Sequence, residues 1–176
     1  MNELVLATPE QAEVCYGIIE EAKHFQREQG FVQWTDDYPN LDTIRYDIQR
    51  AKGYVLMAGG EVAAYLCVDF DGEPAYQEIR GAWHTGEDYA VVHRLAFDSR
   101  FRGRGMAGET FCLVEKLCRN KQVSGIRVDT DSCNQRMQHV LEKCGFQYCG
   151  VVVFQGSGKV AYDKVLFEET VSGGNA

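Results

Sequence analysis

The stretch Arg102-Gly-Arg-Gly-Met-Ala-Gly108 decides how this chain is interpreted. It follows the strand-like apolar run of residues 89–97 and precedes a run of residues 106–118 with helical apolar spacing. A strand, a glycine-rich turn and a helix N-terminus form a phosphate site, because free N–H groups point at the anion and glycine lets it approach the backbone. The segment is basic, in a chain of net charge −8, through Arg94, Arg100, Arg102 and Arg104. We therefore predict a phosphate-bearing ligand at this loop.

One interpretation of the loop is a dinucleotide site. From Gly103 the sequence satisfies G-x-G-x-x-G, and the acidic Asp129 and Asp131 stand at the end of the next expected strand. A dinucleotide loop, however, turns tightly out of its strand into the first glycine. Here residues 98–102 intervene, and no apolar strand residue adjoins Gly103. A plain helix-capping turn would explain the glycines but not the arginines.

A second interpretation is carried by two motifs. From Arg102 the loop satisfies R-x-x-G-x-A, which resembles the pyrophosphate signature of the GCN5-related N-acetyltransferases, whose ligand is acetyl-CoA. After the strand-like run Gly125–Thr130, Asn134 opens a helix whose end, Glu-Lys-Cys-Gly-Phe146, is similar to the family's E-K-x-G-F. The two motifs stand in the family's order. The resemblance covers residues 89–162 and favours this interpretation over the dinucleotide site.

The resemblance implies a mixed α/β fold of the acyl-CoA N-acyltransferase type: a mostly antiparallel, twisted sheet of about seven strands with helices on both faces. The expected strands are residues 4–7, 54–58, 62–70, 89–97, 125–130, 146–154 and 160–167. The expected helices are residues 8–27, 41–52, 106–119 and 134–144, with a helical turn at 74–79 and a surface loop at 81–88. A Rossmann fold would need repeated βα units on both sides of the glycine loop, which this order lacks.

The resemblance also implies a cosubstrate site. In the family two strands splay apart, and the gap admits the pantetheine arm, which bonds to the backbone of the central strand. The cofactor-binding residues implied for acetyl-CoA are Leu95, Ala96, Phe97, Arg102, Gly103, Arg104, Gly105, Met106, Ala107, Gly108 and Asn134.

Acetyl transfer to an amine needs a neutral nitrogen, and a base with a pKa near 7 supplies it. His93 is the first catalytic candidate. Strand alternation would put residues 93, 95 and 97 on one face, and arylalkylamine acetyltransferases have a catalytic histidine in this relation to the strand. The alternative is a core histidine, or one that orients the substrate. Glu78 and Glu87 are rival bases that would act through water.

The chain departs from the family at Leu141, where many members have a tyrosine that protonates the departing thiolate. Leucine has no proton to donate. A CoA thiol has a pKa near that of cysteine, about 8.5, so water can protonate it. Tyr148, Tyr162 and Cys144 are other donors that the sequence does not rank. The alternative function is therefore a module that holds acetyl-CoA without turnover.

The loop of residues 30–40 is expected to contribute to the acceptor pocket. Trp34 and Tyr38 offer stacking or cation–π surfaces, and Asp36 and Asp37 can pair with an ammonium. The alternative is that the two aromatic residues anchor the loop on the core. The expected function is transfer of an acetyl group to a primary amine of a small molecule, in a ternary complex. An NAD-dependent oxidoreductase remains the third possibility.

Composition limits the remaining classes. With 176 residues and 45% apolar residues, we expect one domain over residues 1–168 and a disordered tail over residues 169–176. No apolar stretch approaches the roughly 20 residues that span a bilayer, and the N-terminus has no signal-like pattern, so a cytoplasmic protein without a membrane partner is expected. The sequence pI of about 5.0 argues against nucleic acid.

The cysteines and the C-terminal hairpin give two further expectations. The seven cysteines form an odd set without a C-x-x-C, which predicts free thiols and no metal site. The apolar hairpin of residues 151–154 and 160–167 is a candidate contact surface for a homodimer.

Overall fold

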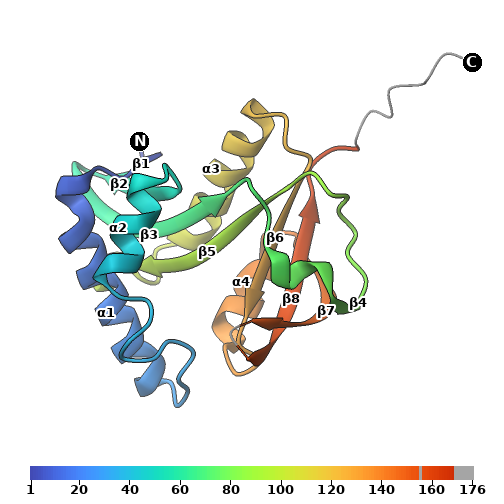
Figure 1. The fold of residues 1–176 in the computed structure, drawn as a ribbon. Coiled ribbons are helices and arrows are strands. Elements are labelled where there is room, and N and C mark those ends of the chain that lie inside the picture. The colour runs from blue at the N-terminus through green and yellow to red at the C-terminus, as the bar shows by residue number, and fades with distance from the viewer. Residues whose placement is uncertain (155, 169–176) are drawn as a thin grey trace, which may run out of the picture.

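A computed structural model describes residues 1–154 and 156–168 of the chain (Figure 1), so the expected tail of residues 169–176 lies outside the described part. The described strands are β1 (Glu3–Leu6), β2 (Gly53–Ala58), β3 (Glu61–Asp69), β4 (Ile79–Gly81), β5 (Tyr89–Phe97), β6 (Gly125–Thr130), β7 (Gln147–Phe154) and β8 (Ser157–Val165). The helices are α1 (Ala12–Glu28), α2 (Leu41–Gln49), α3 (Met106–Asn120) and α4 (Gln135–Lys143), with 3₁₀ turns η1 (Pro9–Gln11), η2 (Pro74–Gln77) and η3 (Ser99–Phe101).

The mixed, mostly antiparallel sheet predicted from the sequence is confirmed. The described strands form one sheet in the order β1-β2-β3-β5-β6-β8-β7-β4. Among them β5 and β6 are the one parallel pair, and the other neighbours run antiparallel. A Rossmann sheet is parallel throughout its core, so this topology rules out the dinucleotide fold.

The sheet has eight strands because β4, expected as part of a turn and a loop, pairs with β7. Two glycines permit this pairing. A Cβ on Gly81 would lie 2.1 Å from the carbonyl oxygen of Cys149, and a Cβ on Gly150 would lie 2.1 Å from that of Arg80. The strand is held by close backbone approach and carries no apolar alternation, which is the signal that sequence patterns detect.

Helices lie on both faces of the sheet. α1 and α2 pack on one face through a cluster that contains Ile19, Ile44 and Tyr65. α3 and α4 pack on the other face through a cluster that contains Phe111 and Leu141. Figure 1 shows α1 and α2, in blue and cyan, at one end of the sheet and the orange-red C-terminal hairpin at the other. In the described parts of the chain, no helix combines the length and apolar composition that crossing a membrane requires.

The sheet opens between its two central strands. Tyr89–Val91 of β5 pair with Gly125–Arg127 of β6. In the described structure the two strands form no ladder pair beyond these residues. The rest of β5 stays paired with β3 alone. The gap left between the diverging strands lies where the glycine loop and the N-terminus of α4 follow them, and it positions the site.

A β-bulge on β5 corrects one expectation. The partner residues step from Tyr65 to Cys67 on β3 but from Ala96 to His93 on β5, so β5 holds an extra residue. Arg94 has a φ of 55°, in the left-handed region. His93 and Leu95 therefore face opposite sides of the sheet. The ring of His93 stacks on Phe154, whereas Leu95 packs against the core beneath α3.

Candidate active site

Two adjoining cavities lie at the gap between β5 and β6. The larger has a volume of about 490 Å³ and is lined mainly by apolar side chains and the glycine loop. The smaller has a volume of about 320 Å³ and is lined by more polar and charged groups. The residues that line both are Gln26, Trp34, Leu95, Asn134 and Met137. A molecule in one cavity can therefore contact a molecule in the other.

The glycine loop forms one wall of the larger cavity. Gly103 and Gly105 have φ values of 74° and 72°, and Gly105 is the N-cap of α3. Larger residues adopt this conformation only with strain. A Cβ built on Gly103, Gly105 or Gly108 would meet nothing within 4 Å. The space in front of the first turn of α3 is thus open, and the N–H groups of that turn are available to an anion.

Arg102 lines the same cavity and has one unsatisfied donor. Its guanidinium carbon lies 4.2 Å from the centroid of the Phe25 ring, and Arg136 lies on that ring at 5.0 Å. The Nη2 atom of Arg102 is buried and has no hydrogen-bond partner among the described residues. A buried donor without a partner costs about 1–3 kcal/mol. An acceptor on a bound anion would remove that cost, so the cavity fits a phosphate-bearing ligand.

The structure divides the basic segment that the sequence presents as one cluster. Arg94 pairs with Asp47 on α2, and Arg100 pairs with Asp98 and Glu61. These two charges are neutralised by protein carboxylates. Arg102 is the arginine of this segment that lines the larger cavity.

Most of the residues predicted to hold the cosubstrate come together around the larger cavity. Those that line it are Leu95, Phe97, Arg102, Gly103, Gly105, Met106, Ala107, Gly108 and Asn134. Ala96 and Arg104 are not among its lining residues: Ala96 is buried against α1, and Arg104 is exposed beside Phe101.

Asn134 ties three segments together where the cavities meet. Its Oδ1 accepts a hydrogen bond from the Met137 N–H at 3.2 Å and caps α4. Its Nδ2 donates to Oε1 of Gln33 at 3.1 Å, and the Thr130 hydroxyl donates to the same oxygen at 3.2 Å. The loop of residues 30–40 is thereby attached to β6 and α4.

Tyr38 and Trp34 of that loop, predicted as acceptor-pocket residues, line the smaller cavity. The hydroxyl of Tyr38 accepts a hydrogen bond from Arg94 at 3.0 Å. Arg94 in turn donates to both carboxylate oxygens of Asp47, at 2.9 and 2.6 Å. The bulge residue therefore fixes the loop of residues 30–40 through Tyr38, and Trp34 also packs on the core cluster under α1. Trp34 thus packs on the core and also lines the cavity.

His93 lines the smaller cavity as a neutral group. Its side chain is 10% exposed, and its Nε2 lies 3.6 Å from Oε2 of Glu73, beyond a hydrogen bond. Burial, and secondly the charge of Arg94, lowers the pKa of His93 to about 3. Glu78 and Glu87 are exposed and line neither cavity. The carboxylate that approaches His93 from the segment before β4 is Glu73.

Three charged residues of the smaller cavity were not selected as acceptor-site residues from the sequence. Asp129 is a buried carboxyl that accepts a hydrogen bond from the Tyr76 hydroxyl, and Lys159 pairs with Asp131 at 3.3 Å. Burial raises the pKa of Asp129, against the hydrogen bond from Tyr76 and the charge of Lys159. The available signal was the position of both aspartates at the carboxyl end of a strand beside the gap.

The possible donors to a departing thiolate are also separated by the structure. Leu141 is fully buried in the core. Tyr162 is buried and donates to Gln138 at 3.1 Å, and Tyr148 is exposed. Cys144 lines the larger cavity, and burial raises the pKa of its thiol.

A protein-family comparison identifies the arrangement. The model of the acetyltransferase (GNAT) family matches residues 19–146. The chain belongs to the GNAT family. This match includes the glycine loop, the strands on both sides of the gap and α4, and it confirms the resemblance noted in the sequence.

Individual GNAT relatives agree with this assignment. The chain is 34% identical to an acetyltransferase of the GNAT family from Streptococcus agalactiae 2603, over 96% of each chain, with a TM-score of 0.85. The streptothricin acetyltransferase of Escherichia coli is 27% identical over 77 residues, which are 44% of this chain and 42% of that protein. The aminoglycoside acetyltransferase AAC(6')-Ib, solved in complex with coenzyme A, shares the fold at 20% identity over 94% and 95% of the two chains, with a TM-score of 0.69.

Proposed function

We propose that this GNAT protein is an acetyl-CoA-dependent N-acetyltransferase that transfers the acetyl group directly to a primary amine of a small molecule. The observation that carries the proposal is the pair of adjoining cavities. One has a mainly apolar lining and ends at a glycine loop, and the other has a mixed lining that contains carboxylates. Their shared wall would let the two substrates meet without a covalent enzyme intermediate.

The larger cavity is the site proposed for acetyl-CoA, which supplies the reactive thioester. The first turn of α3 and Arg102 would bind the pyrophosphate, because they offer free N–H groups and an unsatisfied guanidinium donor. Leu95 and Phe97 of the central strand would lie along the pantetheine arm. The coenzyme A and acetyl-CoA complexes of AAC(6')-Ib, which has the same fold, support this choice of cosubstrate.

The smaller cavity is the site proposed for the amine. Trp34 and Tyr38 offer aromatic faces to a cation, and the Asp129 carboxylate offers a countercharge. The streptothricin and aminoglycoside acetyltransferases among the similar proteins act on small molecules, according to their names. A small amine with both polar and apolar groups fits this mixed lining.

The lowered pKa of His93 and the raised pKa of Asp129 favour Asp129 as the group that accepts the proton. A histidine with a pKa of about 3 takes up a proton at neutral pH only at a cost of about 5 kcal/mol. A carboxylate whose pKa is raised by burial is a stronger base than an ordinary aspartate. We assign Asp129 as the proton acceptor and His93 as a neutral hydrogen-bonding group that orients the amine. Glu78, exposed outside the cavities, has no part in this scheme.

Calorimetric titration with acetyl-CoA, CoA and NAD tests the cosubstrate, and a free-thiol release assay over a panel of amines tests turnover. We expect binding of both CoA forms, and thiol release with at least one polar amine. Binding without release from any amine would favour the alternative, a module that holds acetyl-CoA. Binding of NAD alone would refute the proposal.

The protein's assembly and location are further parts of the proposal. All seven cysteines are free of disulfides in the described structure, which fits a reducing, cytoplasmic location. Val153 of β7 and Val165 of β8 are exposed and lie on the hairpin proposed as the homodimer contact. Sedimentation that gives a monomer at micromolar concentration would remove the dimer from the proposal.

A further inference from the structure

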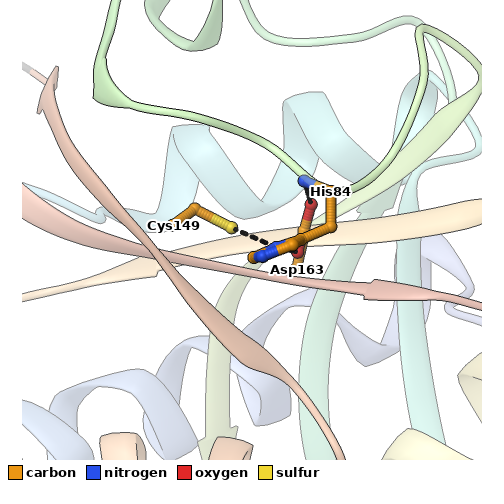
Figure 2. Close-up of side chains that lie close together, drawn as sticks. All are labelled: His84, Cys149 and Asp163. Carbon is orange, nitrogen blue, oxygen red and sulfur yellow. Dashed lines mark hydrogen bonds and ion pairs between the residues drawn. The ribbon is translucent and has the colours of Figure 1, made fainter.

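Outside the two cavities, three metal-binding side chains converge on one point. His84 comes from the loop after β4, Cys149 from β7 and Asp163 from β8, and Figure 2 shows their polar atoms facing one another. Nδ1 of His84 lies 3.4 Å from Sγ of Cys149 and 2.8 Å from Oδ1 of Asp163. Within the described residues this is the one group of three or more such ligands whose donor atoms lie within 4.8 Å of one another. None of the three residues lines the proposed active site.

The backbone builds this convergence. The register of β7 against β8 shifts between Tyr148 and Gly150, so Cys149 occupies an irregular position of the strand. The close approach of Gly81 to Cys149 and Gly150 brings the chain that continues to His84 against β7. The site is therefore a product of tertiary structure, which is why a sequence without C-x-x-C predicted no metal site.

Asp163 is held in a fixed orientation. It is fully buried, and its Oδ2 accepts hydrogen bonds from the N–H groups of His84 and Thr85, at 2.7 and 2.8 Å, and from the Thr85 hydroxyl at 3.0 Å. Its Oδ1 is thereby directed at the His84 ring. Hydrogen bonds that orient a ligating carboxylate are typical of metal sites.

The geometry does not suit nucleophilic catalysis. In a Cys–His–Asp relay the thiol and the carboxylate contact opposite nitrogens of the imidazole. Here Cys149 and Asp163 both approach Nδ1. Three donors that share one centre indicate coordination of a cation instead.

We propose that His84, Cys149 and Asp163 bind one Zn²⁺ ion, with the fourth position open to solvent beside the half-exposed His84. A thiolate with an imidazole selects zinc over the hard cations calcium and magnesium. In a tetrahedral zinc site, neighbouring sulfur, nitrogen and oxygen donors lie about 3.4–3.6 Å apart. The present separations of 3.4 and 2.8 Å require the His84 ring to move outward by a few tenths of an ångström.

Zinc binding changes the protonation of two ligands. The Cys149 thiol loses its proton to water as the zinc–sulfur bond forms, and His84 carries its ring proton on Nε2 so that Nδ1 offers its lone pair. One proton is released per ion when His84 starts neutral. The thiolate and the Asp163 carboxylate balance the two charges of zinc. Arg127, whose Nε donates to the Thr85 hydroxyl at 2.8 Å, is the neighbouring cation that opposes binding.

The site lies on the segment that leads to the acceptor cavity. Trp83, next to His84, donates its indole N–H to the carbonyl of Tyr76 at 3.0 Å, and Tyr76 donates to Asp129. A zinc ion would fasten this segment to the hairpin of β7 and β8. Its role would be to hold the acceptor cavity in shape, and its binding does not depend on the proposed acetyl transfer.

Zinc binding can be tested on the purified full chain after removal of metals with a chelator. We expect close to one equivalent of Zn²⁺ by elemental analysis after desalting, and a near-ultraviolet sulfur-to-cobalt charge-transfer band on titration with Co²⁺. Cys149→Ser should abolish the band, and both Cys149→Ser and His84→Gln should weaken zinc binding by about 100-fold or more. The controls are Cys112→Ser and Cys133→Ser, which remove exposed thiols and should change neither result.

Two outcomes would overturn the proposal. One is a wild-type protein that retains no stoichiometric metal at micromolar zinc. The other is a cobalt band that survives Cys149→Ser but disappears in either control, which would place the ion on a surface thiol. Circular dichroism of each variant checks folding. If Cys149→Ser is unfolded, His84→Gln keeps the test decisive, because that side chain is 44% exposed and tolerates replacement.

Discussion

His93 shows how a single buried residue links stability to pH. The unfolded chain binds a proton at this imidazole below about pH 6.5, whereas the folded protein does so only near a pKa of about 3. The stabilisation is therefore complete above pH 6.5 and is lost as the pH falls, at up to about 1.4 kcal/mol per pH unit. Between neutral pH and pH 5 we expect the free energy of unfolding to fall by about 2 kcal/mol less in His93→Gln than in the wild type. Urea unfolding at several pH values measures this difference. An equal dependence of the unfolding free energy on pH in the two proteins would contradict a neutral, buried imidazole.

Asp129 is the residue whose replacement should act on chemistry rather than on binding. Asp129→Asn keeps the shape and the hydrogen bond from Tyr76 but cannot accept a proton. We expect turnover to fall by about 10²–10⁴-fold, with unchanged CoA affinity. Glu78→Gln is the control, since Glu78 is exposed and lines neither cavity. The wild-type rate should rise with pH through the raised pKa of Asp129, and this limb should vanish in Asp129→Asn. A wild-type rate and pH profile in that variant would return attention to His93.

At the scale of elements, the bulge on β5 depends on a buried ion pair. Arg94 and the Tyr65 hydroxyl both bond to Asp47, which is 4% exposed. Removing one partner leaves the other buried charge unpaired. Asp47→Ala should therefore lower the free energy of unfolding by about 3–5 kcal/mol. Asp36→Ala breaks a comparable pair with Arg27 at the surface and should change stability little. Denaturant unfolding compares the two, and equal losses would mean that the bulge does not rely on Asp47.

The elements also show what sequence patterns can predict. The bounds of β5 and β6 are those expected, because long apolar runs between turn residues define them. The glycine loop and the cap of α4 were likewise predicted, because short local sequence motifs determine them. β4 and the bulge at Arg94 depend on partner strands distant in sequence, so the local hydrophobic periodicity does not predict them. For the same reason the sequence alone could not assign Asp129, Lys159 and Phe25 to the site, because only the tertiary structure places them there.

At the scale of the whole molecule, the larger cavity joins α1, α3, α4 and β5, so a bound cosubstrate should stabilise the entire fold. At 100 times its dissociation constant, CoA would add about 2.7 kcal/mol. Gly108→Val should abolish this gain, because a Cβ there extends into the open cavity while the helix itself tolerates it. Gly17→Val in α1, equally free of contacts, is the matched control and should leave the gain intact. Thermal unfolding with and without CoA measures the gain in each variant. If CoA stabilised Gly108→Val as much as the wild type, the phosphate would bind elsewhere.

The short pairing of β5 with β6 has a dynamic consequence. Only Tyr89–Val91 form the seam between the two halves of the sheet, so the following amides that point away from β3 have no strand partner in the described structure. Such amides exchange their hydrogens rapidly with solvent water. A cosubstrate whose own amide groups bonded to this open edge would complete the ladder and slow that exchange. Hydrogen exchange of residues 92–97 with and without CoA would measure whether the ligand takes the place of a neighbouring strand at this edge.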